Sequence, residues 1–172
     1  MTGVGTIAAV AVAAACAIAP AASAAADCPA DAAPPDAVLC LLNAQRADRK
    51  VPAVRTDARL ARTAQRYADR LGTTGPLTHQ PDGAPSPMER IAASGYGGRA
   101  HAFDFSEVLG RSFGDAASTD QRMQAWMDDT QIRRALLARR FRDLGVGTTT
   151  SGDTTTYVVV IAVVLKPPTR RR

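Results

Sequence analysis

An almost unbroken run of β-branched residues near the C-terminus constrains the fold more than any other feature. Residues 154–165 read TTTYVVVIAVVL, and such residues favour extended backbone because a branched Cβ packs well on a pleated surface. A strand with one solvent-exposed face would alternate apolar and polar residues, whereas this run is apolar at consecutive positions from Tyr157 onward. It is also shorter than the roughly 20 apolar residues that span a bilayer. The run therefore predicts a central strand with helices covering both of its faces.

The chain from residue 36 onward is predicted to supply those helices and one partner strand. Asp36 is a candidate helix cap after two prolines, and Ser86 precedes a proline at a first helical position. Helices are predicted over residues 36–48, 57–71, 87–94 and 131–140. A further helix starts at Ser118 and buries Met123, Trp126 and Met127. A strand over 141–149 and a turn at 150–153 follow. Helices first and a hairpin last predict an α+β fold, a three-layer α-β-α sandwich with a central antiparallel sheet.

The first 26 residues have the layout of a secretory signal peptide. Residues 2–26 contain no charged side chain, and residues 7–19 form an apolar stretch that Pro20 ends. Small residues then offer cleavage sites after Ala24 or Ala26. A lipid anchor on Cys16 is disfavoured because an alanine stands three positions earlier, where such signals prefer a larger aliphatic residue. We therefore expect a secreted, extracellular protein without a stable membrane span.

Two cysteines, Cys28 and Cys40, would remain after cleavage. In the oxidising environment outside the cell, the simple prediction is a disulfide between them that ties residues 27–35 to the first helix of a domain over residues 36–166. Residues 167–172 form a basic tail, and its terminal arginines supply three of the five net positive charges. The other arginines are interspersed with aspartates and aromatic residues are few, so no nucleic-acid partner is expected.

Histidine and glutamate are scarce, with two of each, and this limits where acid–base or metal chemistry could occur. His79 precedes a Pro-Asp-Gly turn, His101 lies in a glycine-rich loop, and Glu107 follows six residues later. Both His79 and Glu107 also have a structural interpretation. His79 could form hydrogen bonds that hold the turn, and Glu107 could accept hydrogen bonds from backbone N–H groups. Glu89 and Arg90 are expected to pair with each other on the surface of their short helix. The sequence has no Gly-x-Ser-x-Gly segment, so serine hydrolysis has little support.

Several segments in order along residues 40–165 together resemble one family. They read CLLNAQRA at 40–47, DARLA at 57–61, LTHQPDG at 77–83, PMERI at 87–91, GY at 95–96, MQAWM at 123–127, FRDLGVG at 141–147 and YVVV at 157–160. This order resembles bacterial CAP-domain proteins, also called SCP-like or YkwD-like, which are relatives of the cysteine-rich secretory proteins, antigen 5 and plant pathogenesis-related proteins. The resemblance implies an α-β-α sandwich, in agreement with the fold predicted from the segments.

The resemblance also implies a cleft lined by histidine and glutamate, where some members bind a divalent metal through two histidines. His79 and Glu107 match two of these positions, but Ile132 stands where the second histidine is expected and Gln124 where related proteins have a second glutamate. Ile132 has no lone pair and Gln124 offers only a neutral oxygen, so a tight zinc site would need another donor. His101 is the candidate substitute, as a weak metal ligand beside His79. No cofactor is therefore required, although weak zinc binding stays open.

A retained scaffold with a depleted site favours a non-catalytic extracellular binding or structural module, which we expect to act as a monomer. Its ligand would be a small polar or lipidic molecule or a component of the cell envelope. The alternative is a secreted hydrolase, metal-dependent or carboxylate-assisted, in which Glu107 acts as general base on a peptide and His79 as metal ligand or electrophile. The sequence leaves the choice between module and enzyme open.

Overall fold

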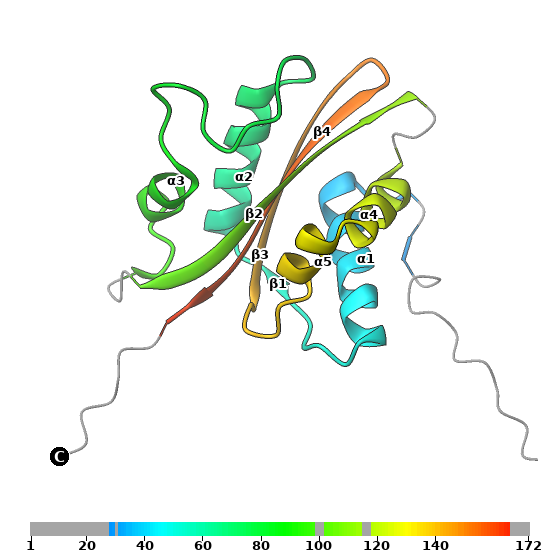
Figure 1. Cartoon of the computed structure of the whole chain (residues 1–172), viewed down its shortest axis with the longest axis vertical. Coiled ribbons are helices and arrows are strands. Elements are labelled where there is room, and N and C mark those ends of the chain that lie inside the picture. Colours follow the sequence, from blue (N-terminus) through cyan, green and yellow to red (C-terminus); the bar gives the residue numbers. More distant parts are fainter. Residues whose placement is uncertain (1–27, 30, 99–101, 115–117, 166–172) are drawn as a thin grey trace, which may run out of the picture.

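The computed structural model describes residues 28–29, 31–98, 102–114 and 118–165. Its elements follow the chain in the order α1, β1, α2, α3, β2, α4, α5, β3 and β4. The sheet forms the middle layer: α2 and α3 lie on one of its faces, and α1, α4 and α5 lie on the other (Figure 1). The predicted α+β fold with α-β-α layers is thus confirmed. The expected signal peptide over 1–26 and the basic tail over 167–172 lie outside the described residues.

The sheet is built around the C-terminal strand, as the β-branched run predicts. The strand order is β1 (Arg55–Thr56), β3 (Asp143–Ser151), β4 (Thr154–Val164) and β2 (Phe103–Phe113). β4 pairs antiparallel with both β2 and β3, and its residues 155–162 are all buried. The short edge strand β1 runs parallel to β3 and was not predicted, so the sheet is mixed at this edge. Only Gly152 and Asp153 connect β3 to β4, which makes the turn shorter than the predicted residues 150–153.

The helices begin where their caps predict, with one exception. α2 (Ala58–Leu71) is capped by Asp57, α3 (Pro87–Ala93) by Ser86 and α4 (Thr119–Asp128) by Ser118. α1 (Pro34–Asp48) starts two residues earlier than predicted and has no side-chain cap, so the predicted role of Asp36 is wrong. The reason is that two prolines already hold φ angles that suit the first turn of a helix.

A buried arginine explains why α5 (Thr130–Leu136) is shorter than the predicted helix over residues 131–140. Arg46 of α1 is fully buried, and its guanidinium donates to the carbonyl oxygens of Leu136 at 2.5 Å and Phe141 at 3.2 Å, with longer bonds to that of Ala138. These carbonyls bond to α1 instead of to the next turn of a longer helix. Burial lowers the pKa of Arg46 to about 10, with a smaller contribution from Arg142, so the side chain stays charged at neutral pH.

Strand β2, which was not predicted, carries Glu107. The side chains of Phe103, Phe105 and Leu109 on this strand pack toward α2 and α3. Val108, between two of these positions in the alternation, packs toward α1 and α4. Because side chains alternate along a strand, Glu107 belongs to the face that α2 and α3 cover.

Helix α2 lies against β3 without side chains between them, because two glycines permit a close approach. A Cβ placed on Gly145 would lie 2.2 Å from the carbonyl carbon of Leu60, and one placed on Gly147 would lie 2.2 Å from the backbone nitrogen of Gln65. The side chain of Gln65 then bonds both the N–H and the carbonyl oxygen of Thr148. This packing fixes the position of α2 relative to the sheet.

On the other face, the predicted disulfide between Cys28 and Cys40 holds the segment before α1. Met123, Trp126 and Met127 of α4 are buried in the adjacent core, also as predicted. Within the described ranges, no helix is long and apolar enough to cross a membrane.

Candidate functional site

The structure brings His79 and Glu107 into direct contact. Nδ1 of His79 lies 2.9 Å from Oε1 of Glu107, although the two residues are 28 positions apart in the chain. The Glu107 side chain is 3% exposed, whereas that of His79 is 57% exposed. The pair therefore presents an imidazole ring to solvent and keeps its carboxylate inside.

Arg90 reaches the same carboxylate from α3. Its Nη2 donates to Oε2 of Glu107 at 2.7 Å, so the two carboxylate oxygens have different partners. The guanidinium lies over the ring of Tyr67, 3.5 Å from the ring centre, and its Nη1 donates to the carbonyl oxygens of His79 and Pro85. Burial raises the pKa of Tyr67, an effect that the charge of Arg90 opposes and that of Glu107 strengthens. The site is thus a buried ion pair with an aromatic ring beneath it and an imidazole at its edge.

The predicted surface pair of Glu89 with Arg90 is wrong. Glu89 instead accepts hydrogen bonds from the backbone N–H and the hydroxyl of Ser86, and these bonds hold the pKa of its carboxyl below the usual value. Consecutive side chains on a helix point in directions about 100° apart. Glu89 can therefore stay at the exposed N-terminus of α3 while Arg90 turns toward the sheet.

The loop over residues 72–86 carries His79, and side chains from two other elements hold it in place. Arg111 of β2 donates to three carbonyl oxygens near the start of the loop. Tyr67 of α2 donates to the carbonyl oxygen of Thr78 at 2.5 Å. Gly83 adopts a φ of 69°, which closes the predicted Pro-Asp-Gly turn in a conformation that glycine tolerates best. The backbone on both sides of His79 is therefore fixed independently of any ligand.

The residues at the two depleted family positions do not face this pair. Ile132 packs against the core on the side of α1 and α4, and Gln124 donates to Asp128 of its own helix. Glu107 lies on the opposite face of the sheet, and both of its oxygens already accept hydrogen bonds. Among the described residues, no group of three or more His, Cys, Asp and Glu side chains could hold a metal ion. The proposed substitute ligand His101 lies outside the described part of the chain.

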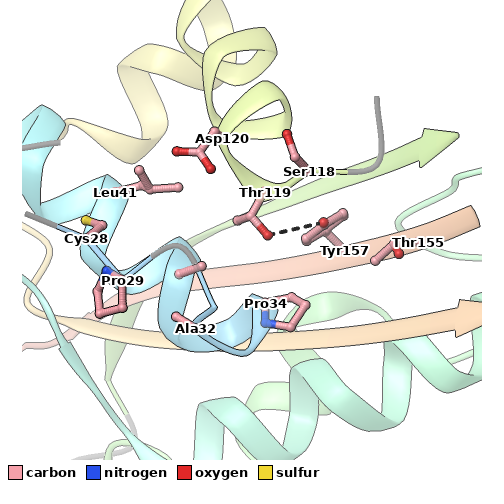
Figure 2. A pocket seen from close by; sticks show the side chains of 11 residues that line it. Cys28, Pro29, Ala32, Pro34, Leu41, Ser118, Thr119, Asp120, Thr155 and Tyr157 are labelled. Carbon is pink, nitrogen blue, oxygen red and sulfur yellow. Dashed lines mark hydrogen bonds between the residues drawn. The ribbon is translucent and has the colours of Figure 1, made fainter. Parts of the chain in front are cut away.

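A separate cavity of about 310 Å³ lies beside the disulfide, between the segment before α1, the start of α4 and strand β4 (Figure 2). The hydroxyl groups of Thr119 and Tyr157 lie 3.4 Å apart at its wall. Asp120 contributes one carboxylate, and none of the described residues that line the cavity is a histidine. Tyr157 belongs to the core on the α1 and α4 face, so this cavity does not extend the site at His79 and Glu107.

A model of the Cysteine-rich secretory protein family, or CAP domain, matches residues 39–163. The chain belongs to this family. Its CAP domain is similar in structure to an outer surface protein from Borrelia burgdorferi, with a TM-score of 0.62 and 19% identity over 74% of this chain and 90% of that one. An extracellular protein containing an SCP domain from Bacillus anthracis gives a TM-score of 0.56 at 15% identity, over 74% of this chain and 40% of that one. The venom allergen-like protein 4 of Schistosoma mansoni gives a TM-score of 0.54 at 11% identity, over 78% of this chain and 91% of that one. No functionally curated protein matches the sequence.

Three side chains of this CAP-domain site were not identified from the sequence: Tyr67, Arg90 and Arg111. Arg90 was expected on the surface of its helix, and neither Tyr67 nor Arg111 was singled out as a candidate site residue. A usable signal lies in β2, where Glu107 occupies an inward position between phenylalanine and leucine. A carboxylate at a buried position requires a cationic or hydrogen-bonding partner, and this requirement would have led to a search for an arginine.

Proposed function

We propose that this CAP domain is an extracellular binding module that does not use Glu107 in catalysis. The observation that supports the proposal is the state of the Glu107 carboxylate, which is 3% exposed and bonded through one oxygen to His79 and through the other to Arg90. A general base must reach the proton or the water on which it acts within hydrogen-bond distance. Glu107 instead holds an arginine and a histidine in position.

The exposed imidazole of His79 is where we place contact with a ligand. Its Nδ1 faces Glu107, and its Nε2 has no partner among the described residues. A ring held through one nitrogen offers the other nitrogen in a fixed direction. The ligand class remains a small polar or lipidic molecule or a component of the cell envelope.

Secretion is supported by three observations of different kinds. Residues 1–26 have the pattern of a signal peptide, and Cys28 and Cys40 form a disulfide, which is typical of an oxidising compartment. Two proteins of similar fold are described as an outer surface protein and an extracellular protein. N-terminal sequencing of exported protein is expected to begin at Ala25 or Asp27. A chain that keeps all of its first 26 residues would contradict the proposal.

The same exposed imidazole favours a second candidate function, a hydrolase in which His79 rather than Glu107 handles the proton. A buried carboxylate that orients a histidine is a recurring part of hydrolase sites. Turnover of casein or envelope peptides that disappears both in His79→Ala and in Glu107→Gln would support this candidate and overturn the non-catalytic proposal.

Zinc titration by calorimetry tests the metal question directly. We expect no binding in the micromolar range, because one imidazole and a fully bonded carboxylate do not make a tight tetrahedral site. The matched control is Asp82→Asn, which removes an exposed carboxylate from the same loop. Micromolar binding that is lost in His79→Ala and kept in Asp82→Asn would show that the site holds a metal after all.

A further inference from the structure

Four arginines form one stripe along the exposed side of α2. Arg59, Arg62, Arg66 and Arg70 follow one another at spacings of three, four and four residues, so they lie within about 80° of one another on the helix surface. All four side chains are exposed, and none of their guanidinium groups forms a hydrogen bond or ion pair with another described residue. Along the whole sequence the arginines are interspersed with aspartates, whereas the folded chain gathers these four on one surface.

Nearby carboxylates do not neutralise this arginine stripe. α2 and its cap contain four arginines and two acids, Asp57 and Asp69, which leaves two net positive charges. Asp69 accepts hydrogen bonds from Gln65 and from Thr149 of β3, so its carboxylate is drawn toward the sheet edge. Glu89 of α3 is held by Ser86 at the start of its own helix. The stripe therefore keeps its excess positive charge.

A cavity of about 250 Å³ opens between α2 and α3 at the C-terminal end of the stripe. Arg66 and Arg70 line it, and Glu89 is the one acid in its wall. Two buried polar atoms without a hydrogen-bond partner in the described protein, Thr63 Oγ1 and Arg90 Nε, both belong to residues of this wall. The protein thus leaves hydrogen-bonding capacity unused where the arginines converge.

We propose that the arginine stripe binds a linear anionic polymer whose phosphate or carboxylate groups repeat along the chain. The Cα atoms of the four arginines follow one another in steps of about 4.5–6 Å along the helix axis, over a total of about 16.5 Å. Guanidinium binds the oxygens of phosphate and carboxylate through paired hydrogen bonds. A single small anion would engage one or two of these arginines, whereas a polymer engages all four. The inference rests on the proposed binding function and identifies its envelope component by chemical class.

Fluorescence anisotropy of labelled long-chain polyphosphate and of labelled polyglutamate, titrated with the exported protein, tests this surface. The variant Arg66→Gln/Arg70→Gln removes two charges from the stripe. The control Arg49→Gln/Arg134→Gln removes two charges from exposed positions at the end of α1 and on α5, on the other face of the sheet. Each phosphate contact contributes about 0.7 to the slope of log K against log salt concentration. The stripe variant should therefore bind polyphosphate about 25-fold more weakly at 100 mM salt and show a slope smaller by about 1.4.

Binding of either polymer that weakens in the stripe variant and stays within about twofold in the control supports the proposal. Equal weakening in both variants would overturn it, because the effect would then come from net charge alone. Orthophosphate that competes as well as polyphosphate at equal phosphate concentration would also overturn it, in favour of a site for one anion. So would binding to vesicles of phosphatidylcholine and phosphatidylglycerol without binding to either polymer. Thermal unfolding checks that both variants fold, and the zinc and casein assays report separately on the non-catalytic proposal.

Discussion

Arg90→Met is predicted to destabilise the protein far more when Glu107 is present than when it is absent. Methionine keeps an unbranched apolar stem over Tyr67 but removes the guanidinium that lies 2.7 Å from Glu107. The carboxylate would remain 3% exposed with His79 as its one side-chain partner. Removing one member of a buried ion pair costs about 3–5 kcal/mol, because the other charge stays buried without compensation. Since His79 remains, we expect a loss of about 3 kcal/mol in the free energy of unfolding.

The reverse substitution, Glu107→Gln, should have a smaller effect. The amide oxygen of glutamine can still accept a hydrogen bond from Arg90, which also keeps the carbonyl oxygens of His79 and Pro85 and the ring of Tyr67. A loss of about 1.5 kcal/mol is therefore expected, typical of a hydrogen bond to a charged group. The double variant removes both charges and should lose about 2 kcal/mol. The coupling energy between the two positions is then about 2.5 kcal/mol.

Urea unfolding of the four proteins, followed by tryptophan fluorescence, gives this coupling energy. Trp126 is the only tryptophan and lies in the core on the opposite face, so its signal reports the unfolding of the whole domain rather than a change at the site. The slopes of the unfolding curves should agree among the variants. Arg66→Met is the matched control, since it removes an exposed arginine from α2 and should change stability by no more than about 0.5 kcal/mol. A coupling energy below about 0.5 kcal/mol would refute the reasoning, because Arg90 and Glu107 would then act independently.

Three further predictions concern the scaffold. Gly147→Ala should lower the unfolding free energy by about 3 kcal/mol or more in urea titrations, because its Cβ would lie 2.2 Å from the backbone of α2; an unchanged midpoint would contradict the close packing. Replacing Cys28 and Cys40 with serine should cost about 3 kcal/mol by loop-closure entropy, and calorimetry should show a lower Tm than in the oxidised protein. Burial and the hydrogen bond to Asp143 raise the pKa of Tyr96, so the folded protein keeps a proton that the unfolded chain loses near the ordinary tyrosine pKa. The stabilisation is complete below that pH and falls as the pH rises through and beyond it. In alkaline unfolding titrations the unfolding free energy of Tyr96→Phe should therefore decline less than that of the wild type. An equal decline in the two proteins would contradict the assignment.

The fold could be predicted because its strongest signals are local. The run that forms β4 is apolar on both faces, and the caps Asp57, Ser86 and Ser118 stand directly before the helices that they start. β2 was missed because Glu107 and Arg111 interrupt its apolar alternation, and their partners come from other elements. The two-residue strand β1 forms only where β3 provides a backbone to pair with. Such pairing has no signature in the short segment itself.

The candidate site could be predicted in its residues but not in its contacts. His79 and Glu107 were identified from the sequence, yet their contact depends on how the loop after α2 folds over β2. The nearest oppositely charged neighbour of Arg90 in sequence is Glu89, and local reasoning therefore paired them. In the folded chain the carboxylate of Glu89 serves the cap of α3, and Arg90 bonds to a residue 17 positions away. The arginine stripe of α2 had a local signal in its three- and four-residue spacings, but an overall count of charges concealed it.

Arg90 belongs to the ion pair and also lies beside the arginine stripe, so it links the two proposed functions. Arg90 lines the cavity at the end of the stripe, but its charge is already compensated by Glu107 at 2.7 Å. Arg66 and Arg70 carry no such partner, so they set the charge that an anion meets in the cavity. Glu107→Gln would release the charge of Arg90 toward the cavity and should, if anything, strengthen polymer binding while it weakens the fold. The Glu107 carboxylate thus limits the positive charge of the proposed binding surface beside it.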